Sequence, residues 1–356
     1  MNEAEIIFET LTGPHGDIGL ITLNRPKMLN ALNQAMCIAM YIQLSQWQQN
    51  TRIKAVVIRG AGERAFCAGG DIRSLYELRN EPIPDKPFFW YEYRLNHQIF
   101  HFSKPYIALL DGLTMGGGVG LSVHGDFRVG TEKLQFAMPE TGIGFFPDVG
   151  GGYFLPRCPG KLGWYLALTG QSIALADAIT ARIVTHHIGS TDLDAFLAAL
   201  VATPWSENLT ATAEDVLRQF STNTIADSEL AIHREIIDLC FSQRSVTDIL
   251  AHLQQGNAWT QSVAQLLSTR SPTSLAVTFA QLTQGAAMSF DDCMRMEYQI
   301  ALQFLRSPDF YEGVRAAIID KDRKPKWQPA TLTEVSEHSI ADFFKAKKNQ
   351  RALEFV

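Results

Sequence analysis

Residues 105–123 read PYIALLDGLTMGGGVGLSV, an apolar run that passes into a cluster of glycines. Tyr106 to Leu110 have the length and composition of a buried strand. Gly116 to Gly118 then stand where the chain turns into a helix. Three glycines cost backbone entropy that a simple connection does not require, so we expect a ligand to approach the backbone here. The run nears bilayer length, but Asp111 and the glycines argue against a membrane span.

The same rhythm of strand, turn and helix recurs along the first half of the chain. Strand-like runs lie at 18–23, 55–58 and 127–129, and residues 36–47 carry apolar side chains at helical spacing. Repeated units of this kind predict an α/β fold with a buried parallel sheet. Beyond about residue 190 nearly every segment has a helical pattern. We therefore expect an α/β core at 1–190 and a helical region at 191–356.

The composition is that of a soluble globular protein, with 46% hydrophobic and 19% charged residues among 356. A net charge of -6 gives no electrostatic support for a nucleic-acid partner. The five cysteines are scattered without a CxxC pair, which favours a reducing compartment. The start, MNEAEIIFET, shows neither an export nor an import signal, so the expected location is cytoplasmic.

A second glycine turn lies at 65–72, AFCAGGDI, between a strand-like run and a helical one. Asp71 is placed to cap that helix. Neither this turn nor GGGVG has the spacing of a dinucleotide site or a phosphate loop. Two such turns at neighbouring strand ends can instead supply two backbone N–H donors, the geometry of an oxyanion hole.

Two acids interrupt the otherwise apolar stretch MPETGIGFFPDVGG at 138–151. A buried ionised carboxylate is costly unless it is paired or used. Taken alone, Glu140 is better interpreted as a residue at a helix start and Asp148 as a turn residue. Together with the two glycine turns, they favour a catalytic pocket. His97, His101 and His124 share no ligand spacing, so no metal is expected.

Four motifs in this order resemble the crotonase (enoyl-CoA hydratase/isomerase) superfamily: NRPK with NAL at 24–32, AFCAGGDI, MGGGVGLS and FAMPETGIGFFPDVGG. The resemblance implies a spiral of repeated β-β-α units with a C-terminal all-α region. Residues 138–160 and 307–327 are similar to the 3-hydroxyisobutyryl-CoA hydrolase branch, thioesterases of valine breakdown. The expected activity is therefore hydrolysis of 3-hydroxyisobutyryl-CoA, or of a similar short 3-hydroxyacyl-CoA.

The resemblance also implies roles for single residues. The N–H groups of Gly70 and Gly117 correspond to the family's oxyanion hole. Gly120 stands where hydratases carry one of their two glutamates, which argues against a plain hydratase. The positions that contact coenzyme A in family members are Lys27, Met28, Ala68, Asp71 and Ile72.

The remaining catalytic positions are acids. Glu140 matches the second hydratase glutamate, and the hydrolase branch adds an aspartate that matches Asp148. Glu92 matches a substrate-binding glutamate of the branch, although a glutamate on a helix is as often a solvated residue. With Gly117, these three acids form the predicted substrate site. Glu140 attacks the thioester or deprotonates a water, and the sequence leaves both routes open.

The resemblance further implies that the helical region completes the coenzyme A site and makes subunit contacts, which leaves room for a homo-oligomer. Its basic residues either meet phosphate groups or form a solvated charge run: Lys321, Arg323, Lys324 and Lys326. No cofactor is expected, because coenzyme A is part of the substrate. The alternatives are an enoyl-CoA hydratase or isomerase and, further off, a non-catalytic acyl-CoA binding protein.

Overall fold

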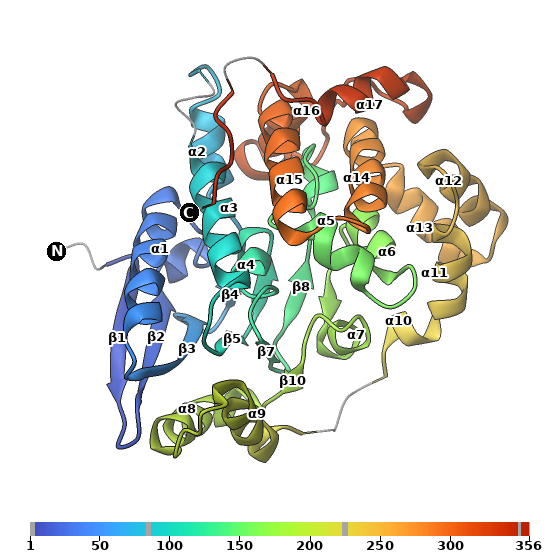
Figure 1. Cartoon of the computed structure of the whole chain (residues 1–356). Helices are drawn as coiled ribbons and strands as arrows, with labels where there is room; N and C mark the ends of the chain where they lie inside the picture. Colours follow the sequence, from blue (N-terminus) through green and yellow to red (C-terminus); the bar gives the residue numbers. More distant parts are fainter. Residues whose placement is uncertain (1–3, 83–86, 223–226, 348–349, 356) are drawn as a thin grey trace. The chain divides into compact units, whose positions relative to one another are not determined.

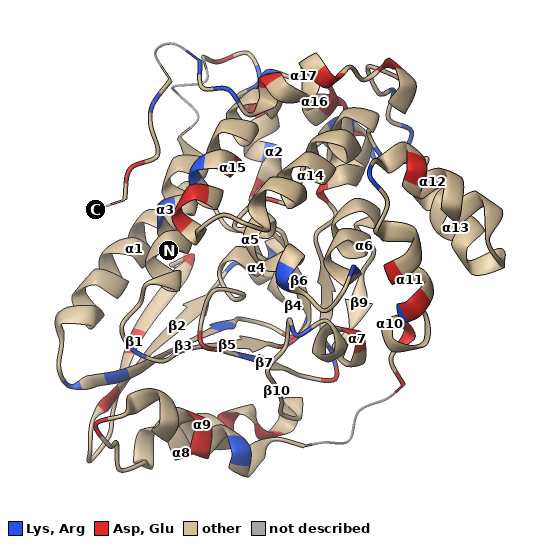
Figure 2. Cartoon of the chain, turned by 45° about the vertical axis from the view of Figure 1, so that its right-hand side comes forward, with Lys and Arg blue, Asp and Glu red and all other residues tan. Residues whose placement is uncertain are grey.

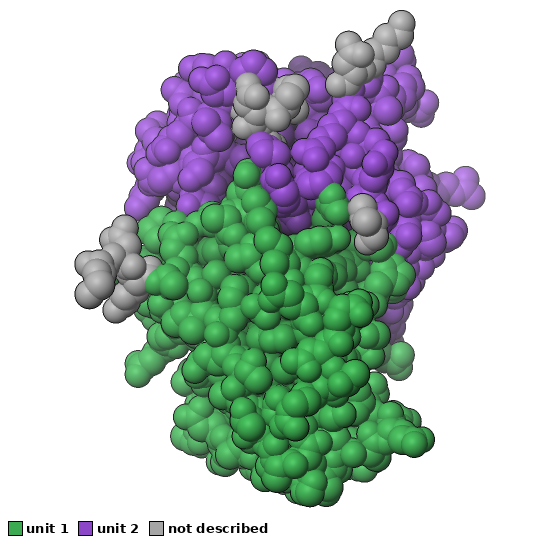
Figure 3. All heavy atoms as spheres, turned by 60° about the vertical axis from the view of Figure 1, so that its left-hand side comes forward, with its two compact units in different colours: residues 1–70, 94–136, 173–229 green, residues 71–93, 137–172, 230–356 purple. Residues whose placement is uncertain are grey.

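The computed structural model describes residues 4–82, 87–222, 227–347 and 350–355 (Figure 1). Contacts within the chain define two compact units, each made of segments that are separate in the sequence (Figure 3). Unit 1 comprises Met1–Gly70, Arg94–Phe136 and Ile173–Glu229, and unit 2 comprises Asp71–Tyr93, Ala137–Ser172 and Leu230–Val356. These units do not follow the predicted division at residue 190, which stays a prediction.

Unit 1 holds a six-stranded sheet with the order β1-β2-β3-β5-β7-β10. The strands are β1 (Ile6–Thr12), β2 (Asp17–Leu23), β3 (Ile53–Gly60), β5 (Tyr106–Leu110), β7 (Phe127–Gly130) and β10 (His186–His187). β1 and β2 are antiparallel, and the other neighbours are parallel. The four strands predicted from apolar runs are confirmed. β2 and β5 are buried along their whole length, as strands covered on both faces must be.

Helices cover both faces of this sheet. On one face, alternate residues of the strands form a core with α8 (Leu193–Ala202) and α9 (Leu209–Phe220). On the other face lies α1 (Gln34–Gln49), whose Trp47 packs edge-on against Phe8 and against the backbone at Gly19. Asn33 starts α1 by accepting a hydrogen bond from the N–H of Met36 at 2.9 Å.

A second sheet consists of four short strands in the order β4-β6-β8-β9. They are β4 (Ala65–Cys67), β6 (Leu113–Met115), β8 (Gln135–Ala137) and β9 (Ile173–Ala174). β4 and β6 are parallel, so their carboxyl ends lie at the same edge of the sheet. The two glycine turns follow these two strands, and the second continues into α4 (Gly117–Gly120).

Unit 2 is mainly helical. Its longer helices are α6 (Leu162–Thr169), α11 (Arg234–Phe241), α12 (Val246–Gln255), α13 (Ala258–Leu267), α14 (Pro272–Gly285) and α15 (Phe290–Phe304). The shorter ones are α2 (Ile72–Glu77), α5 (Gly151–Phe154), α10 (Glu229–Ile232), α16 (Pro308–Val314) and α17 (Glu337–Phe343). Serine side chains cap the starts of α12, α14 and α15. Acidic and basic residues are intermixed on the helices and loops (Figure 2).

The longest stretches of helix are amphipathic or buried within the fold. None of the helices in the described part of the chain combines the length and the hydropathy needed to span a bilayer. The apolar run at 105–123, for example, is divided between β5, β6 and α4.

Candidate active site

The two glycine turns lie side by side in unit 1. A side chain at Gly69 would place its Cβ 3.4 Å from the carbonyl oxygen of Met115 and 3.9 Å from the amide nitrogen of Gly117. Gly69 and Gly116 have φ values of 109° and 47°, in the region that favours glycine. A Cβ at Gly118 would collide with the carbonyl oxygen of Cys67. Glycine is therefore required where α4 approaches the end of β4.

The amide groups of these turns are available for a ligand. Gly117 is the first residue of α4, where a helix leaves its N–H groups unpaired. Within the described ranges, neither the Gly70 N–H nor the Gly117 N–H donates a hydrogen bond to the rest of the chain. The turns thus offer two N–H donors, which is what the predicted oxyanion hole requires.

The predicted coenzyme A contacts fall in both units. Lys27 and Met28 belong to an exposed single turn of 3-10 helix in unit 1, where Met28 is 46% exposed. The N–H of Ala68 donates to the carbonyl oxygen of Leu29 at 3.0 Å, which holds that turn beside the end of β4. Asp71 and Ile72 begin α2 in unit 2, and Asp71 caps this helix as predicted.

The three predicted acids all lie in unit 2 and are almost fully buried. Glu92 is on α3 (Phe88–Phe100), Glu140 begins a 3-10 turn at Glu140–Ile143, and Asp148 precedes α5. Their exposed fractions are 2%, 6% and 5%. Phenylalanine rings pack in the same segments, with Phe89 stacked on Phe145 at 5.4 Å between ring centroids. The three carboxyl groups are therefore largely shielded from bulk solvent.

Burial raises the pKa of each acid, and repulsion by neighbouring carboxylates adds to the shift of Glu92 and Glu140. Burial raises the pKa of Asp148 to about 7, although the hydrogen bond from Tyr93 acts in the opposite direction. The pKa of Glu140 is raised well above its usual value, first by burial and then by the charge of Asp148. The pKa of Glu92 is raised by burial and by the charges of Asp148 and Glu140. The three carboxyl groups are thus close enough to titrate together.

Two carboxylate oxygens in this cluster are buried without a hydrogen-bond partner in the described part of the chain. Among the residues that the structure describes, neither Glu92 Oε1 nor Glu140 Oε2 has a hydrogen-bond partner, although both are buried. Buried polar atoms are ordinarily paired, and unpaired ones concentrate where a ligand or water binds. The structure thus brings Glu92, Glu140 and Asp148 together, while their individual roles stay predictions.

The sequence reasoning missed Tyr93, which lies beside Glu92 on α3. Its hydroxyl group donates a hydrogen bond of 2.8 Å to Asp148 Oδ2, and its side chain is fully buried. Burial, followed by the charge of Asp148, raises the pKa of Tyr93 well above its usual value, so the hydroxyl keeps its proton. The neighbouring Glu92 was the only signal in the sequence that pointed to this turn of the helix.

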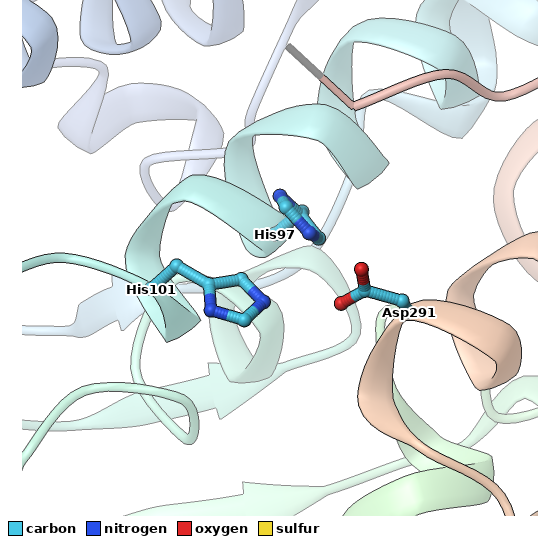
Figure 4. A group of neighbouring side chains, drawn as sticks. All are labelled: His97, His101 and Asp291. Carbon is cyan, nitrogen blue, oxygen red and sulfur yellow. The ribbon is translucent and has the colours of Figure 1, made fainter.

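His97 lies on α3, and His101 directly follows the end of this helix, four residues further on. The rings of His97 and His101 have centroids 4.4 Å apart, and both side chains project from the same side of α3 in Figure 4. The third residue drawn there, Asp291, belongs to α15 in unit 2, whereas His97 and His101 belong to unit 1. The absence of a metal stays a prediction.

Comparisons with known proteins show the family to which the chain belongs. Residues 18–344 match the enoyl-CoA hydratase/isomerase family. The chain therefore belongs to this family. It is 46% identical over 346 residues to the 3-hydroxyisobutyryl-CoA hydrolase of Homo sapiens, and the matched region covers 95% of this chain and 89% of that protein. The protein of the same name from Xenopus laevis is 48% identical, covering 92% and 86%.

Solved structures share the fold along nearly the whole chain. A carnitinyl-CoA dehydratase from Mycobacterium thermoresistibile has a TM-score of 0.89 and 38% identity, covering 98% of both chains. An enoyl-CoA hydratase from Rhodobacter sphaeroides has a TM-score of 0.88 and 33% identity, covering 99% of this chain and 100% of that one. The predicted crotonase fold is confirmed.

One prediction is wrong. The sequence was expected to belong to a cytoplasmic protein, but the relatives from Homo sapiens, Gallus gallus and Bos taurus are named as mitochondrial enzymes. The expectation had rested on an acidic first segment, MNEAEIIFET, in which no import signal is visible. The lack of a visible import signal in this one segment does not decide where the protein is located.

Proposed function

We propose that this chain hydrolyses the thioester bond of 3-hydroxyisobutyryl-CoA, or of a similar short 3-hydroxyacyl-CoA, to the free hydroxy acid and CoA. The observation that carries the proposal is the buried pair Glu140 and Asp148, with glycine at position 120 where a hydratase needs a second glutamate. Relatives at 44–48% identity are named for this reaction. In the cell the reaction would belong to valine breakdown.

The first step in this proposal is activation of the thioester. The N–H groups of Gly70 and Gly117 hold the carbonyl oxygen and stabilise the negative charge that develops on it. Loss of one such donor typically lowers the rate by about 10²- to 10³-fold. In this proposal, the coenzyme A part of the substrate contacts Lys27, Met28, Ala68, Asp71 and Ile72.

Glu140 then supplies the chemistry through Oε2, the oxygen that accepts no hydrogen bond from the described residues. In one route the carboxylate attacks the acyl carbon and the C–S bond breaks, which releases the CoA thiolate. Water then attacks the glutamyl carbonyl of the resulting anhydride, which frees the hydroxy acid and restores Glu140. In the other, Glu140 takes a proton from water as the oxygen attacks, and that proton passes to the departing sulfur. A single turnover in ¹⁸O-water separates the two routes: attack of water on the glutamyl carbonyl leaves ¹⁸O in Glu140, whereas the second route places ¹⁸O in the product acid.

Asp148 and Glu92 bind the substrate's hydroxyl group in this proposal. Tyr93 occupies Asp148 Oδ2, so the other oxygen keeps acceptor capacity for the hydroxyl. Glu92 offers Oε1, which has no hydrogen-bond partner among the described residues.

The proposed chemistry needs no cofactor. A homo-oligomer is part of the proposal as well, and sedimentation velocity tests it.

The test is thiol release by the purified protein from 3-hydroxyisobutyryl-CoA, 3-hydroxypropionyl-CoA, acetyl-CoA and crotonyl-CoA. The two hydroxyacyl thioesters are expected to react fastest. If crotonyl-CoA is hydrated and no thiol is released, the chain is a hydratase and the proposal fails. If all four bind but none reacts, the chain is a binding protein.

A further inference from the structure

The turn that follows Asp148 has an unusual backbone conformation. Val149 has a φ of 49° and Gly150 a φ of 89°, two successive residues in the left-handed region. A β-branched residue rarely adopts this conformation, and it persists only where the surroundings impose it. A hydrogen bond of 2.8 Å from the Gly151 N–H to the Asp148 carbonyl oxygen closes the turn. Something outside the turn must hold this shape.

Glu297 on α15 is placed to hold it. Its Oε2 accepts a hydrogen bond from the Gly150 N–H, and its Oε1 accepts one from the Gly152 N–H, both at 2.7 Å. The side chain is fully buried and remote in sequence from the turn. One carboxyl group therefore fixes the backbone on both sides of Gly151.

Gln281 on α14 completes the arrangement. Its Nε2 donates to Glu297 Oε1 at 3.0 Å and to the carbonyl oxygen of Pro147 at 2.7 Å. Pro147 immediately precedes Asp148, so the backbone is held before and after the acid. Burial raises the pKa of Glu297 to about 8, and the N–H donors of Gly150, Gly152 and Gln281 oppose that shift. All three of these groups donate to the carboxyl group, which suits its ionised form.

We propose that Glu297, together with Gln281, is a positioning residue that holds Asp148 in its working orientation against Tyr93. This inference rests on the proposed function of Asp148. Glu297 acts only through the turn, and it does not touch the substrate. The alternative is that Glu297 merely stabilises the fold of unit 2, as any buried and well-paired acid does.

A double-mutant cycle separates the two roles. Glu297→Gln keeps the size of the side chain but turns an acceptor into a donor that faces an N–H group. In the wild-type background we expect kcat/KM for 3-hydroxyisobutyryl-CoA to fall about 10²-fold, the usual cost of a misplaced catalytic group. In an Asp148→Asn background the same change should cost little further activity. Equal losses in both backgrounds would show a general structural effect and overturn the inference.

Hydrogen exchange gives a readout that does not depend on activity. The amides of Gly150 and Gly152 should lose protection in Glu297→Gln. If Glu297→Gln does not fold, Gln281→Met replaces it as the test. This variant keeps the side-chain volume but removes the N–H donor, and it should cause a smaller loss of protection at the same two amides. The matched control is Asp17→Asn in unit 1, the same change at a buried acid that Arg52 Nε contacts at 2.9 Å. Asp17→Asn should produce no loss of protection confined to residues 147–152, since any effect of lower global stability would be spread over both units.

The outcomes are distinct. If the wild-type protein releases no thiol, the proposed function fails. Hydrogen exchange at Gly150 and Gly152 still tests whether Glu297 holds the turn after Asp148. If the wild type is active and Glu297→Gln matches it, or if the two amides keep their protection, the inference is wrong.

Discussion

The buried state of Asp148 predicts that replacing it stabilises the protein at neutral and alkaline pH. Its pKa rises from 3.8 to about 7 on folding, mainly because burial disfavours the charge. Below the lower value both states are protonated. Between the two values the unfolded chain ionises while the folded protein stays protonated, so the free energy of unfolding falls as pH rises. Above about pH 7 the full penalty is present.

The size of this penalty follows from the two pKa values. At about 1.4 kcal/mol for each factor of ten, the difference corresponds to about 4 kcal/mol, as an upper limit. Asp148→Asn removes the charge and retains an oxygen that accepts the hydrogen bond from Tyr93. We therefore expect the variant to exceed the wild type in stability by up to about 4 kcal/mol near pH 8, and by little near pH 4.

The assay is chemical denaturation of both proteins at the two pH values, followed by tryptophan fluorescence. Asp17→Asn is the control with the opposite sign, because the hydrogen bond from Arg52 lowers the pKa of Asp17. Its loss should destabilise the protein at neutral pH and matter less in acid. An Asp148→Asn variant that is no more stable than the wild type near pH 8 would show that burial of the Asp148 charge does not destabilise the folded protein.

Three further predictions concern activity and packing. Tyr93→Phe removes a hydrogen bond to a carboxylate, so kcat/KM should fall about 10-fold or more. Because that hydrogen bond lowers the pKa of Asp148, the acid limb of the pH-rate profile should also move to higher pH. An unchanged pH-rate profile would contradict this prediction. The wild-type profile itself should lose activity in acid well above the usual titration range of a glutamate, since burial and Asp148 raise the pKa of Glu140; a profile flat down to pH 4.5 would contradict it. Gly118→Ala brings a Cβ against the carbonyl oxygen of Cys67, so it should cost about 1–3 kcal/mol of stability by denaturation and reduce activity, and a fully stable, active variant would show that α4 does not need this glycine.

Local patterns in the sequence predict much of the fold. Apolar runs such as Tyr106 to Leu110 are long enough to be recognised as strands, and Asp71 caps its helix as the turn before it indicates. The strands of the second sheet have two or three residues each, too few for a periodic pattern to emerge. The packing of α8 and α9 on the first sheet is a tertiary contact with no local signal.

The candidate site divides in the same way. Glu140 and Asp148 stand out because acids are unexpected in an apolar, glycine-rich stretch. Tyr93 is an ordinary aromatic residue on a helix until the fold brings it to Asp148. Glu297 lies 147 residues from Gly150, so only the folded chain shows that the two meet.

The central claim is that Glu140 drives hydrolysis of the thioester. The most direct measurement is the rate of thiol release from 3-hydroxyisobutyryl-CoA by the wild type and by Glu140→Gln, with CoA binding measured in parallel to show that the variant is folded. We expect kcat to fall by about 10³-fold in Glu140→Gln while CoA binding is kept. A Glu140→Gln variant that releases thiol at the wild-type rate would contradict it.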